Sequence, residues 1–415
     1  MRVLLASLLL AATSNVSSET VDLFGFAEVS AGSAEGESSW IEGGFGRLTH
    51  GGDGPGDRDA FARGELQLGM IYEPRPGLRG VAHLVGRAHS ADRGRAVGVT
   101  EAYLDYVRAL ESPTQISVRI GQFFHLSSME NIDDLWASPY TLTNSAINSW
   151  MGEEFRPIGV ELGWQRFLPG GDRLSATVTV FGGNDTAGTL LAWRGFALHN
   201  RLSVFGEVVA LPPLFSLEDP ALFGGKQRAD GTRPFGRDLD GRPGWIGQLG
   251  WQRTGQLDLR FSYSDNRGDR ERHGNEYAWR TRFGLAGAKW QPTPATVLAF
   301  EWLEGTTAMA FPGMPWVEAD FRAWYLLAAL NHGRGWWAVR HDRFRTDERD
   351  NHPLAEINDE SGHAWTLAWN LDMREDWRLA VEYLRVSGHR VAVTQSGADG
   401  DLGGDLITIA LRRYF

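Results

Sequence analysis

Arginine and acidic side chains recur at alternate positions along many segments of this sequence. Arg63 and Glu65 are two residues apart, as are Asp258 and Arg260. Side chains two residues apart lie on the same side of a β-strand. If strands of this kind lined a channel, cations and carboxylates on the lining side could orient and select small charged solutes, as rings of charge do in channels.

The patterns of common enzyme classes are missing from the sequence. The 11 His residues show no HExxH spacing, and neither a Gly-x-Ser-x-Gly elbow nor a glycine-rich phosphate loop occurs. The absence of Cys excludes disulfides and thiolate metal sites. We therefore expect no enzyme, no cofactor and no metal. The net charge of −11 also argues against a nucleic-acid partner.

The first 18 residues have the form of a secretory signal peptide. Arg2 precedes an apolar run of about ten residues, and small polar residues follow it. A membrane-spanning helix needs about 20 apolar residues, so this run is too short. The sequence predicts a signal peptide over 1–18 and an exported domain over 19–415.

Polar and apolar residues alternate in most of the remaining chain. In Leu257–Ser264, Leu and aromatic residues share one face, and Asp, Arg and Ser share the other. The same pattern over Tyr277–Leu285 predicts Arg280 and Arg282 on the polar face. Strands of this kind suit a soluble sandwich or a membrane barrel whose apolar face meets lipid.

Short and long connections alternate between these strands, as in barrels of the outer membrane. The segments number about 18, and 16 is the alternative; the even count suits a bacterial barrel. The division of 189–211 into strands 189–198 and 202–211 is the weakest boundary. The fold class predicted is all-β, a transmembrane antiparallel β-barrel without a separate plug domain.

A long connection at Ser127–Phe155 follows the fifth predicted strand. A lumen of 16 to 18 strands is too wide for side chains alone to fill. This loop therefore is the candidate for an inward-folded constriction, with an external position as the equal alternative. Its acidic residues are Glu130, Asp133, Asp134, Glu153 and Glu154. The connection 212–243 is expected outside the barrel.

The chain ends in Leu411-Arg-Arg-Tyr-Phe415, which resembles the C-terminal signature of Gram-negative outer-membrane proteins. Phe415 and the apolar residues Ile407, Ile409 and Leu411 match that signature, whereas Arg413 departs from it. The resemblance implies that Phe415 is read by the barrel-assembly machinery.

A second resemblance covers about 45 residues. Arg119-Ile-Gly-Gln-Phe123, a loop and then Arg156-Pro-Ile-Gly-Val160 are similar to phosphate-selective porins of the O/P type. That family implies 16-stranded trimers with channels lined by Lys and Arg. This sequence has two lysines, Lys226 and Lys289, so a ladder of lysines is not carried over.

The polar faces of the predicted strands would line the lumen. The candidate channel-lining residues are Arg63, Arg87, Arg119, Arg260, Arg280, Arg282, Arg340, Glu101, Asp105 and Glu161. The alternative is that these residues pair across neighbouring strands and stiffen the wall.

These patterns predict an outer-membrane porin, a water-filled channel for diffusion of small hydrophilic solutes or ions, with anions such as phosphate among them. One alternative is a structural or adhesive barrel with a closed lumen, and another is an export channel for acidic polysaccharide. The expected partners are outer-membrane lipid, polar solutes and the assembly machinery. The sequence leaves monomer and homotrimer open.

Overall fold

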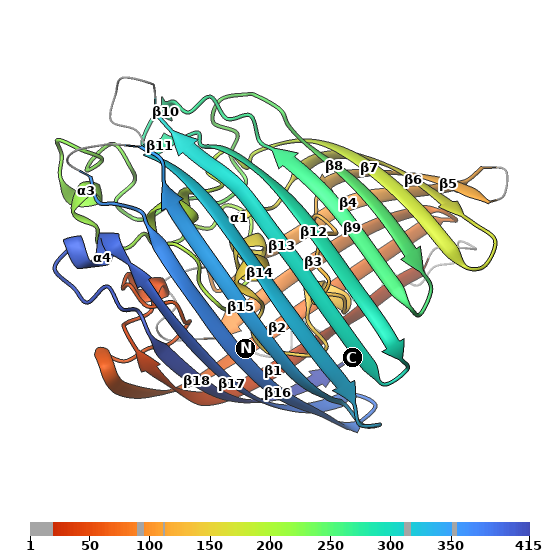
Figure 1. Cartoon of the computed structure of the whole chain (residues 1–415). Helices are drawn as coiled ribbons and strands as arrows, with labels where there is room; N and C mark the ends of the chain where they lie inside the picture. Colours follow the sequence, from red (N-terminus) through yellow and green to blue (C-terminus); the bar gives the residue numbers. More distant parts are fainter. Residues whose placement is uncertain (1–19, 89–94, 111–112, 311–316, 351–354) are drawn as a thin grey trace, which may run out of the picture.

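The chain forms one closed antiparallel β-barrel of 16 strands (Figure 1). The structure is a computed structural model that describes residues 20–88, 95–110, 113–310, 317–350 and 355–415, so the signal peptide predicted over 1–18 lies outside the described residues. Each strand pairs with its neighbour in the chain, and β18 pairs with β1 to close the ring. The barrel strands are β1 (Thr20–Gly36), β2 (Gly54–Arg75), β3 (Leu78–Ala88), β4 (Val97–Ala109), β5 (Thr114–Gln122), β6 (Ile158–Phe167), β7 (Asp172–Gly182), β8 (Gly244–Arg253), β9 (Leu257–Asp265), β12 (Arg280–Thr293), β13 (Thr296–Met309), β14 (Val317–Asn331), β15 (Trp336–Glu348), β16 (Glu360–Arg374), β17 (Trp377–Arg390) and β18 (Gly404–Tyr414).

The remaining elements are short and lie in the connections. They are η1 (Trp40–Glu42), η2 (Asp134–Trp136), α1 (Ala146–Glu154), α2 (Thr189–Trp193), α3 (Phe215–Glu218), α4 (Val391–Gln395) and the small sheet of β10 (Arg272–His273) and β11 (Glu276–Tyr277). Among the described residues, none of the helices has the length and apolar character to cross a bilayer.

The prediction of a barrel is confirmed, and its strand count is 16 rather than 18. The two strands expected at 189–198 and 202–211 do not form. This segment contains α2 and irregular backbone, and most of it is buried. Because both predicted strands are absent, the number of barrel strands stays even. Every later turn therefore lies at the end of the barrel at which it was predicted.

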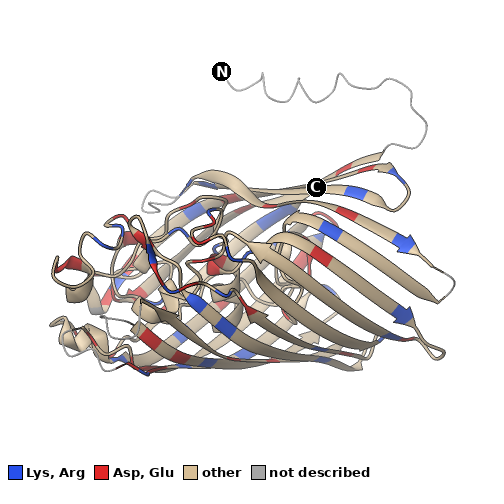
Figure 2. Ribbon diagram, turned by 90° about the horizontal axis from the view of Figure 1, so that it is seen from above, with Lys and Arg blue, Asp and Glu red and all other residues tan. Residues whose placement is uncertain are grey.

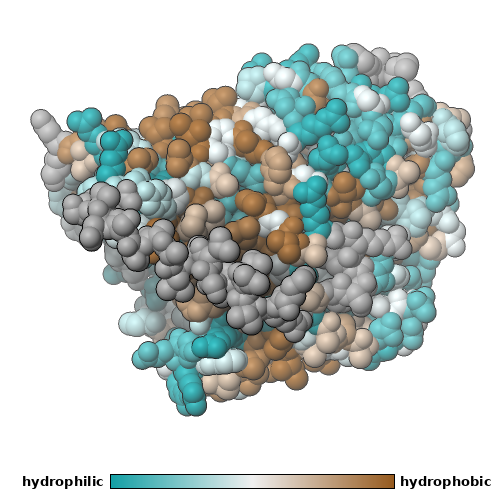
Figure 3. All heavy atoms as spheres, turned by 180° about the vertical axis from the view of Figure 1, so that it is seen from behind, coloured by the Kyte–Doolittle hydropathy of each residue, from teal (hydrophilic) through white to brown (hydrophobic). Residues whose placement is uncertain are grey.

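The strands place one row of side chains outside and the other inside, as their period of two requires. On β9, Leu259 and Phe261 are exposed, whereas Asp258 and Ser262 are buried. Large exposed apolar residues continue on most other strands, for example Val29 and Leu249. Figure 3 shows apolar residues gathered on one side of the barrel between hydrophilic ends. Because strand edges are absent from a closed ring, such an outer surface suits lipid.

The strand β12 has the opposite orientation to the one predicted. Thr281, Phe283 and Leu285 are buried and face inward, whereas Arg280 and Arg282 belong to the exposed outer row. The prediction that Arg280 and Arg282 line the channel is therefore wrong. The physical reason is that the interior beside β12 is filled by an apolar loop, so apolar side chains are needed on the inner face here.

The long connections that the structure describes lie at one end of the barrel, and the short turns lie at the other (Figure 1). The strands β1 and β18 begin and end the barrel at the end with the short turns. We call the two ends the loop end and the turn end. Figure 2 shows acidic and basic residues gathered among the long loops. In outer-membrane barrels the short turns face the periplasm and the long loops face outside.

Candidate functional site

The connection between β5 and β6, residues 123–157, folds into the barrel. Most of its side chains are buried, and α1 within it is buried on every side. Ser145 caps α1 by accepting a hydrogen bond from the backbone N–H of Asn148. This is the inward-folded loop that the sequence suggested at Ser127–Phe155, and we call it the constriction loop.

Acidic side chains of the barrel wall hold the backbone of the constriction loop. Glu382 on β17 accepts the N–H groups of Leu142 and Thr143 at 2.6 and 3.0 Å. Asp342 on β15 accepts the N–H of Ala146 at 3.0 Å. Glu301 on β13 accepts the side-chain amide of Asn148 at 2.8 Å. Buried N–H groups need partners, and these carboxylates supply them in the irregular backbone before α1 and in its first turn.

Arg340 on β15 lies at the centre of this attachment. Its guanidinium donates to Glu130 at 3.0 Å, to Asp342 at 2.8 Å and to the carbonyl of Asn144 at 2.8 Å. The side chains of Arg340 and Glu130 have no exposed surface. Arg340 was predicted to line the channel and Glu130 to lie on the constriction loop, and the pair joins this loop to the wall.

Aromatic packing completes the attachment. Trp150 of α1 contacts Phe283 and Phe321, with ring centroids 5.2 and 5.4 Å apart. Phe155 lies 5.1 Å from Phe283 between ring centroids. The inner face of β12–β15 is consequently a packed apolar core.

A second segment, residues 184–214, also enters the barrel and joins the constriction loop. Glu153 accepts hydrogen bonds from Arg194 at 2.6 Å and from the indole N–H of Trp40 at 3.0 Å. Its oxygen also lies 3.2 Å from Nε2 of His199. Burial alone would raise the pKa of Glu153, but Arg194 and His199 hold this pKa well below its ordinary value. Glu153 therefore carries a buried negative charge that ties three segments together.

The first connection, residues 37–53, completes this arrangement at the loop end. Arg47 donates to Glu360 of β16 and, at 3.0 Å, to the carbonyl of Phe196. Glu154 accepts the indole N–H of Trp150 at 2.6 Å and the N–H of Leu190 at 3.0 Å. Glu153 and Glu154, predicted as acidic residues of the constriction loop, belong to it and are wholly buried. We call 37–53, 123–157 and 184–214 together the interior segments.

The opposite half of the wall, from β2 to β9, is polar and charged. At the turn end it borders a cavity of about 610 Å³. The cavity's charged lining residues are Arg79, Glu101, Arg119, Asp133, Asp134, Arg173, Asp258, Arg260 and Lys289. Five cations thus face four carboxylates there, so the lining is nearly balanced.

Four of the predicted cations keep inward positions on this charged half. Arg119 lies 3.8 Å from Asp105 and 3.6 Å from Glu161. Arg63 donates to Ser30 at 3.0 Å. Arg87 donates to the carbonyl of Leu202. Arg260 contacts Asp258 at 2.6 Å and the carbonyl of Leu126 at 3.1 Å.

The predicted acids near the cavity divide into two groups. Glu101 accepts the N–H of Phe124 at 2.7 Å, so it also holds the constriction loop. Asp133 and Asp134 line the cavity, and Asp133 lies 3.8 Å from Arg378. Sequence reasoning missed Arg79, Arg173 and Lys289 as lining residues. The alternation that identified Arg119 could have found Arg79 and Arg173.

A second cavity, of about 790 Å³, opens among the loops at the other end. Segment 212–243, which was expected outside, forms much of its wall, and α3 lies at the loop end in Figure 1. Its residues Leu222 and Phe223 are nevertheless buried against Trp193 and Trp279. Beside this cavity Arg201 pairs with Glu207 at 2.5 Å, and Arg87 lies 3.7 Å from Glu207.

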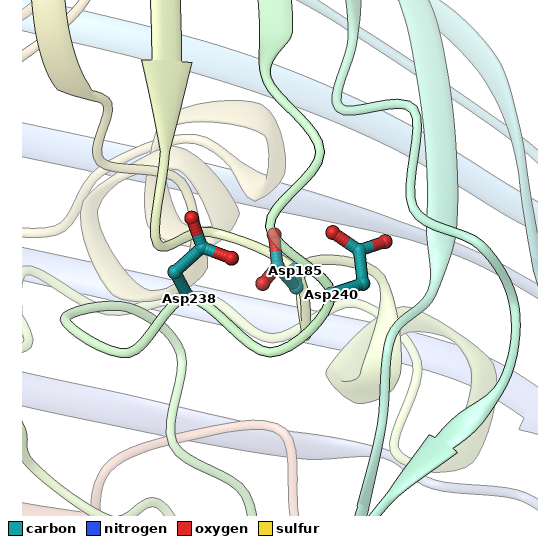
Figure 4. A group of neighbouring side chains, drawn as sticks. All are labelled: Asp185, Asp238 and Asp240. Carbon is teal, nitrogen blue, oxygen red and sulfur yellow. The ribbon is translucent and has the colours of Figure 1, made fainter.

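Three carboxylates gather where segment 212–243 meets the end of β7 (Figure 4). Asp185, Asp238 and Asp240 place carboxylate oxygens within 4.8 Å of one another. Asp185 is buried and accepts the N–H of Leu239. Burial, followed by the charges of Asp240 and Asp238, raises the pKa of Asp185 to about 7. Repulsion within this group is thus reduced by protonation of its buried member.

Comparison with known proteins supports the fold alone. No family model matches the sequence, and the curated proteins contain no match. The outer membrane channel DcaP of Acinetobacter baumannii superposes with a TM-score of 0.56 at 12% identity, over 98% of this chain and 100% of that one. Salmonella typhi OmpF, in complex with daunomycin, gives 0.52 at 12% identity over 95% and 97%. An anion-selective porin from Comamonas acidovorans gives 0.50 at 11% identity over 96% and 100%. The chain therefore has the fold of outer-membrane porins and channels.

Proposed function

We propose that this barrel is a porin that passes small hydrophilic solutes by diffusion along its charged half. The observation that carries the proposal is the unequal division of the interior. The interior segments fill the side of β12–β17 with a packed core, whereas the wall of β2–β9, which they touch through Arg87 and Glu101, keeps inward charges and borders a cavity at the turn end. A pathway from the loop-end cavity to the turn-end cavity would pass Arg87, Arg63 and Arg119.

The mechanism needs no bound group. Solutes would lose few water molecules in a polar passage, and facing cations and carboxylates would align the dipoles and charges of what passes. The balance of five cations and four carboxylates in the turn-end cavity predicts weak selectivity. The O/P-type resemblance implies instead a preference for anions such as phosphate. The same experiment tests it, because that preference would give a large reversal potential of the sign expected for anions.

Conductance in a planar bilayer tests the proposal. We expect discrete open steps, and a salt gradient should give a small reversal potential. The double variant Arg119→Gln, Arg260→Gln should shift that potential toward cation preference, because two inward positive charges are lost. Arg253→Gln is the matched control, since Arg253 lies on the outer row at the turn end and pairs with Asp172. An unchanged potential in the double variant would contradict the proposed pathway.

A closed structural or adhesive barrel is the second candidate, and the interlocked interior segments favour it. Glu153, Arg340 and Arg47 lock all three segments, and the described interior beside β12–β17 is densely filled. Silence in the bilayer from correctly folded protein would support this candidate and overturn the porin.

A homotrimer is part of the proposal. One of the similar structures, OmpT of Vibrio cholerae, is in a trimer form, with a TM-score of 0.50 at 10% identity. Analytical ultracentrifugation of the barrel in a mild detergent would distinguish the two states, trimer and monomer. We expect the mass of a trimer.

A further inference from the structure

The outer wall carries a cationic patch just beyond the apolar band, on the loop-end side of β15–β17. These strands are neighbours in the barrel (Figure 1). The patch consists of His341, Arg343, His363 and Arg385. Register places Arg343 opposite His363 and Arg385 opposite Trp365. The rings of His341 and His363 lie 6.1 Å apart between centroids.

The patch lies at the boundary between lipid and water. Toward the turn end, the same outward rows continue with Trp365 and Leu367 on β16, both exposed. The ring of Trp365 lies 4.3 Å from His341 between centroids. Aromatic residues mark the interface of outer-membrane barrels. The cations therefore lie at the depth of headgroups, and the loops place that depth in the outer leaflet.

Two guanidinium groups of this patch have no partner in the part of the chain that the structure describes. Arg343 and Arg385 are exposed, and neither forms a hydrogen bond or ion pair with any residue that the structure describes. The nearby carboxylates are already engaged. Asp405 is opposite Arg385 in the register but bonds Arg58 at 2.6 Å. Asp401 bonds His389 at 2.7 Å, and Asp347 bonds Arg345.

The surface around Arg343 is also hollowed. A depression of about 590 Å³ is lined by Arg343, His341, His363, Ser361, Ser387 and His389, among others. Hydroxyl and imidazole groups thus surround the guanidinium of Arg343, and the one carboxylate in the lining, Asp401, is paired with His389. Arginine binds phosphate through two parallel N–H···O bonds, and such bonds are strong beside lipid because water is scarce there.

We propose that this patch binds a phosphate group on the sugar headgroup of an outer-leaflet glycolipid. Arg343 on β15 and the other residues of the depression hold the phosphate. Arg385 on β17 contributes a second positive charge. The acyl chains lie along Leu367 and the rest of the apolar band. The inference depends on the position of the barrel in the outer membrane and not on whether its lumen conducts.

Native mass spectrometry of the detergent-purified barrel tests the proposal. The probe is a bisphosphorylated diglucosamine glycolipid, compared with the same lipid after removal of its phosphates, with phosphatidylglycerol and with inorganic phosphate as competitor. The variant R343Q/R385Q removes both free guanidinium groups. The matched control R253Q/R413Q removes two outer-row arginines at the turn end, which pair with Asp172 and Asp376.

We expect the R343Q/R385Q barrel to bind the phosphorylated glycolipid at least about tenfold more weakly, which corresponds to about 1.4 kcal/mol. The control should stay within about twofold, and R343K/R385K should retain part of the affinity because charge remains without the planar fork. The dephosphorylated lipid should bind wild type and R343Q/R385Q alike.

Several results would overturn the proposal. One is equal glycolipid affinity in wild type and R343Q/R385Q when both migrate as folded barrels on unheated gels. Another is equal loss in the control pair. Effective competition by phosphatidylglycerol or inorganic phosphate would indicate a general anion site, and protection of the patch by a second copy of the chain would indicate a subunit interface. Conductance of R343Q/R385Q should equal that of wild type, which separates this test from that of the proposed channel.

Discussion

Arg340 has no exposed surface, yet it is surrounded by charge. Its partners Glu130 and Asp342 come from the constriction loop and from its own strand. A buried ion pair contributes little against well-packed apolar residues, but removal of one partner leaves an uncompensated charge that costs about 3–5 kcal/mol. Arg340 is therefore one of the main attachments of the constriction loop to the wall.

We expect Arg340→Met to detach the constriction loop without unfolding the barrel. Conductance should rise and become noisier, and the midpoint of thermal unfolding should fall. Arg322→Gln is the control, because Arg322 lies on the outer row and its pair with Asp347 is half exposed, where ion pairs contribute about 0–1 kcal/mol. If the conductance of Arg340→Met were as low and as quiet as that of wild type, this role would be contradicted.

The raised pKa of Asp185 predicts a pH dependence of the loop around it. The folded pKa of about 7 exceeds the ordinary value of 3.8. Folding therefore favours the protonated carboxyl, so the contribution to stability is complete below about pH 4 and declines as pH rises toward 7. Above pH 7 the loss is complete, and Asp238 and Asp240 then repel a charged Asp185.

Hydrogen exchange of residues 236–241, corrected for intrinsic rates, measures this dependence. Protection in wild type should fall between pH 4 and 7. In Asp185→Asn it should stay nearly constant, because the amide oxygen still accepts the N–H of Leu239 and carries no charge. Protection in wild type that does not change over this range would show that the carboxyl of Asp185 does not titrate there, which would contradict the prediction.

At the scale of elements, contacts between the interior segments stabilise them more than their own short helices do. The helix α2 has five residues, too few to be stable alone. Glu153 joins α1 to Arg194 just after α2 and to Trp40 of the first connection. These contacts replace the strand pairing that the sequence suggested for 189–211.

We expect Glu153→Gln to loosen segment 184–214 selectively. Arg194 would lose its buried partner, at a cost of about 3–5 kcal/mol, whereas the indole of Trp40 could still donate to the amide oxygen. Exchange of backbone amides over 187–198 should accelerate at least tenfold, while amides of β13–β15 remain protected. Glu42→Gln is the control, with the same substitution in the first connection, because Glu42 is exposed and forms only a long 3.5 Å contact with Ser38.

At the scale of the whole molecule, closure joins the two ends of the barrel. The N–H of Phe415 donates to the carbonyl of Gly25 at 3.1 Å, and the N–H of Gly25 donates to the carbonyl of Phe415 at 3.0 Å. Arg412 on β18 bonds Glu28 on β1 at 2.8 Å across the same junction. The last residue thus belongs to the closing pair of strands, and its aromatic side chain is exposed.

The proposed assembly signal leads to a prediction in cells. Phe415→Ala keeps the closing backbone bonds, so refolding of the purified protein into detergent should be unaffected. The amount of folded barrel in the outer membrane should nevertheless fall several-fold, as measured by migration on unheated gels. Tyr414→Ala is the control, because its side chain points to the opposite face. Normal outer-membrane levels of Phe415→Ala would exclude a role of Phe415 in recognition.

The sequence by itself determined the barrel. Period-two patterns and the alternation of short and long connections are local properties, and all 16 strands of the barrel were identified from them. The inward fold of the constriction loop was suggested by its place after the fifth strand and by a lumen too wide to remain unfilled.

Only the tertiary structure decided which face of β12 is inside and which segments fill the lumen. Phe283 faces inward because Trp150 and Phe155, more than 120 residues earlier in the chain, lie against it. Segment 189–211 is rich in apolar residues and packs inside the ring, and an isolated sequence window cannot distinguish a core segment from a lipid-facing strand. Both environments exclude water, so only the position of the segment in the closed barrel separates them.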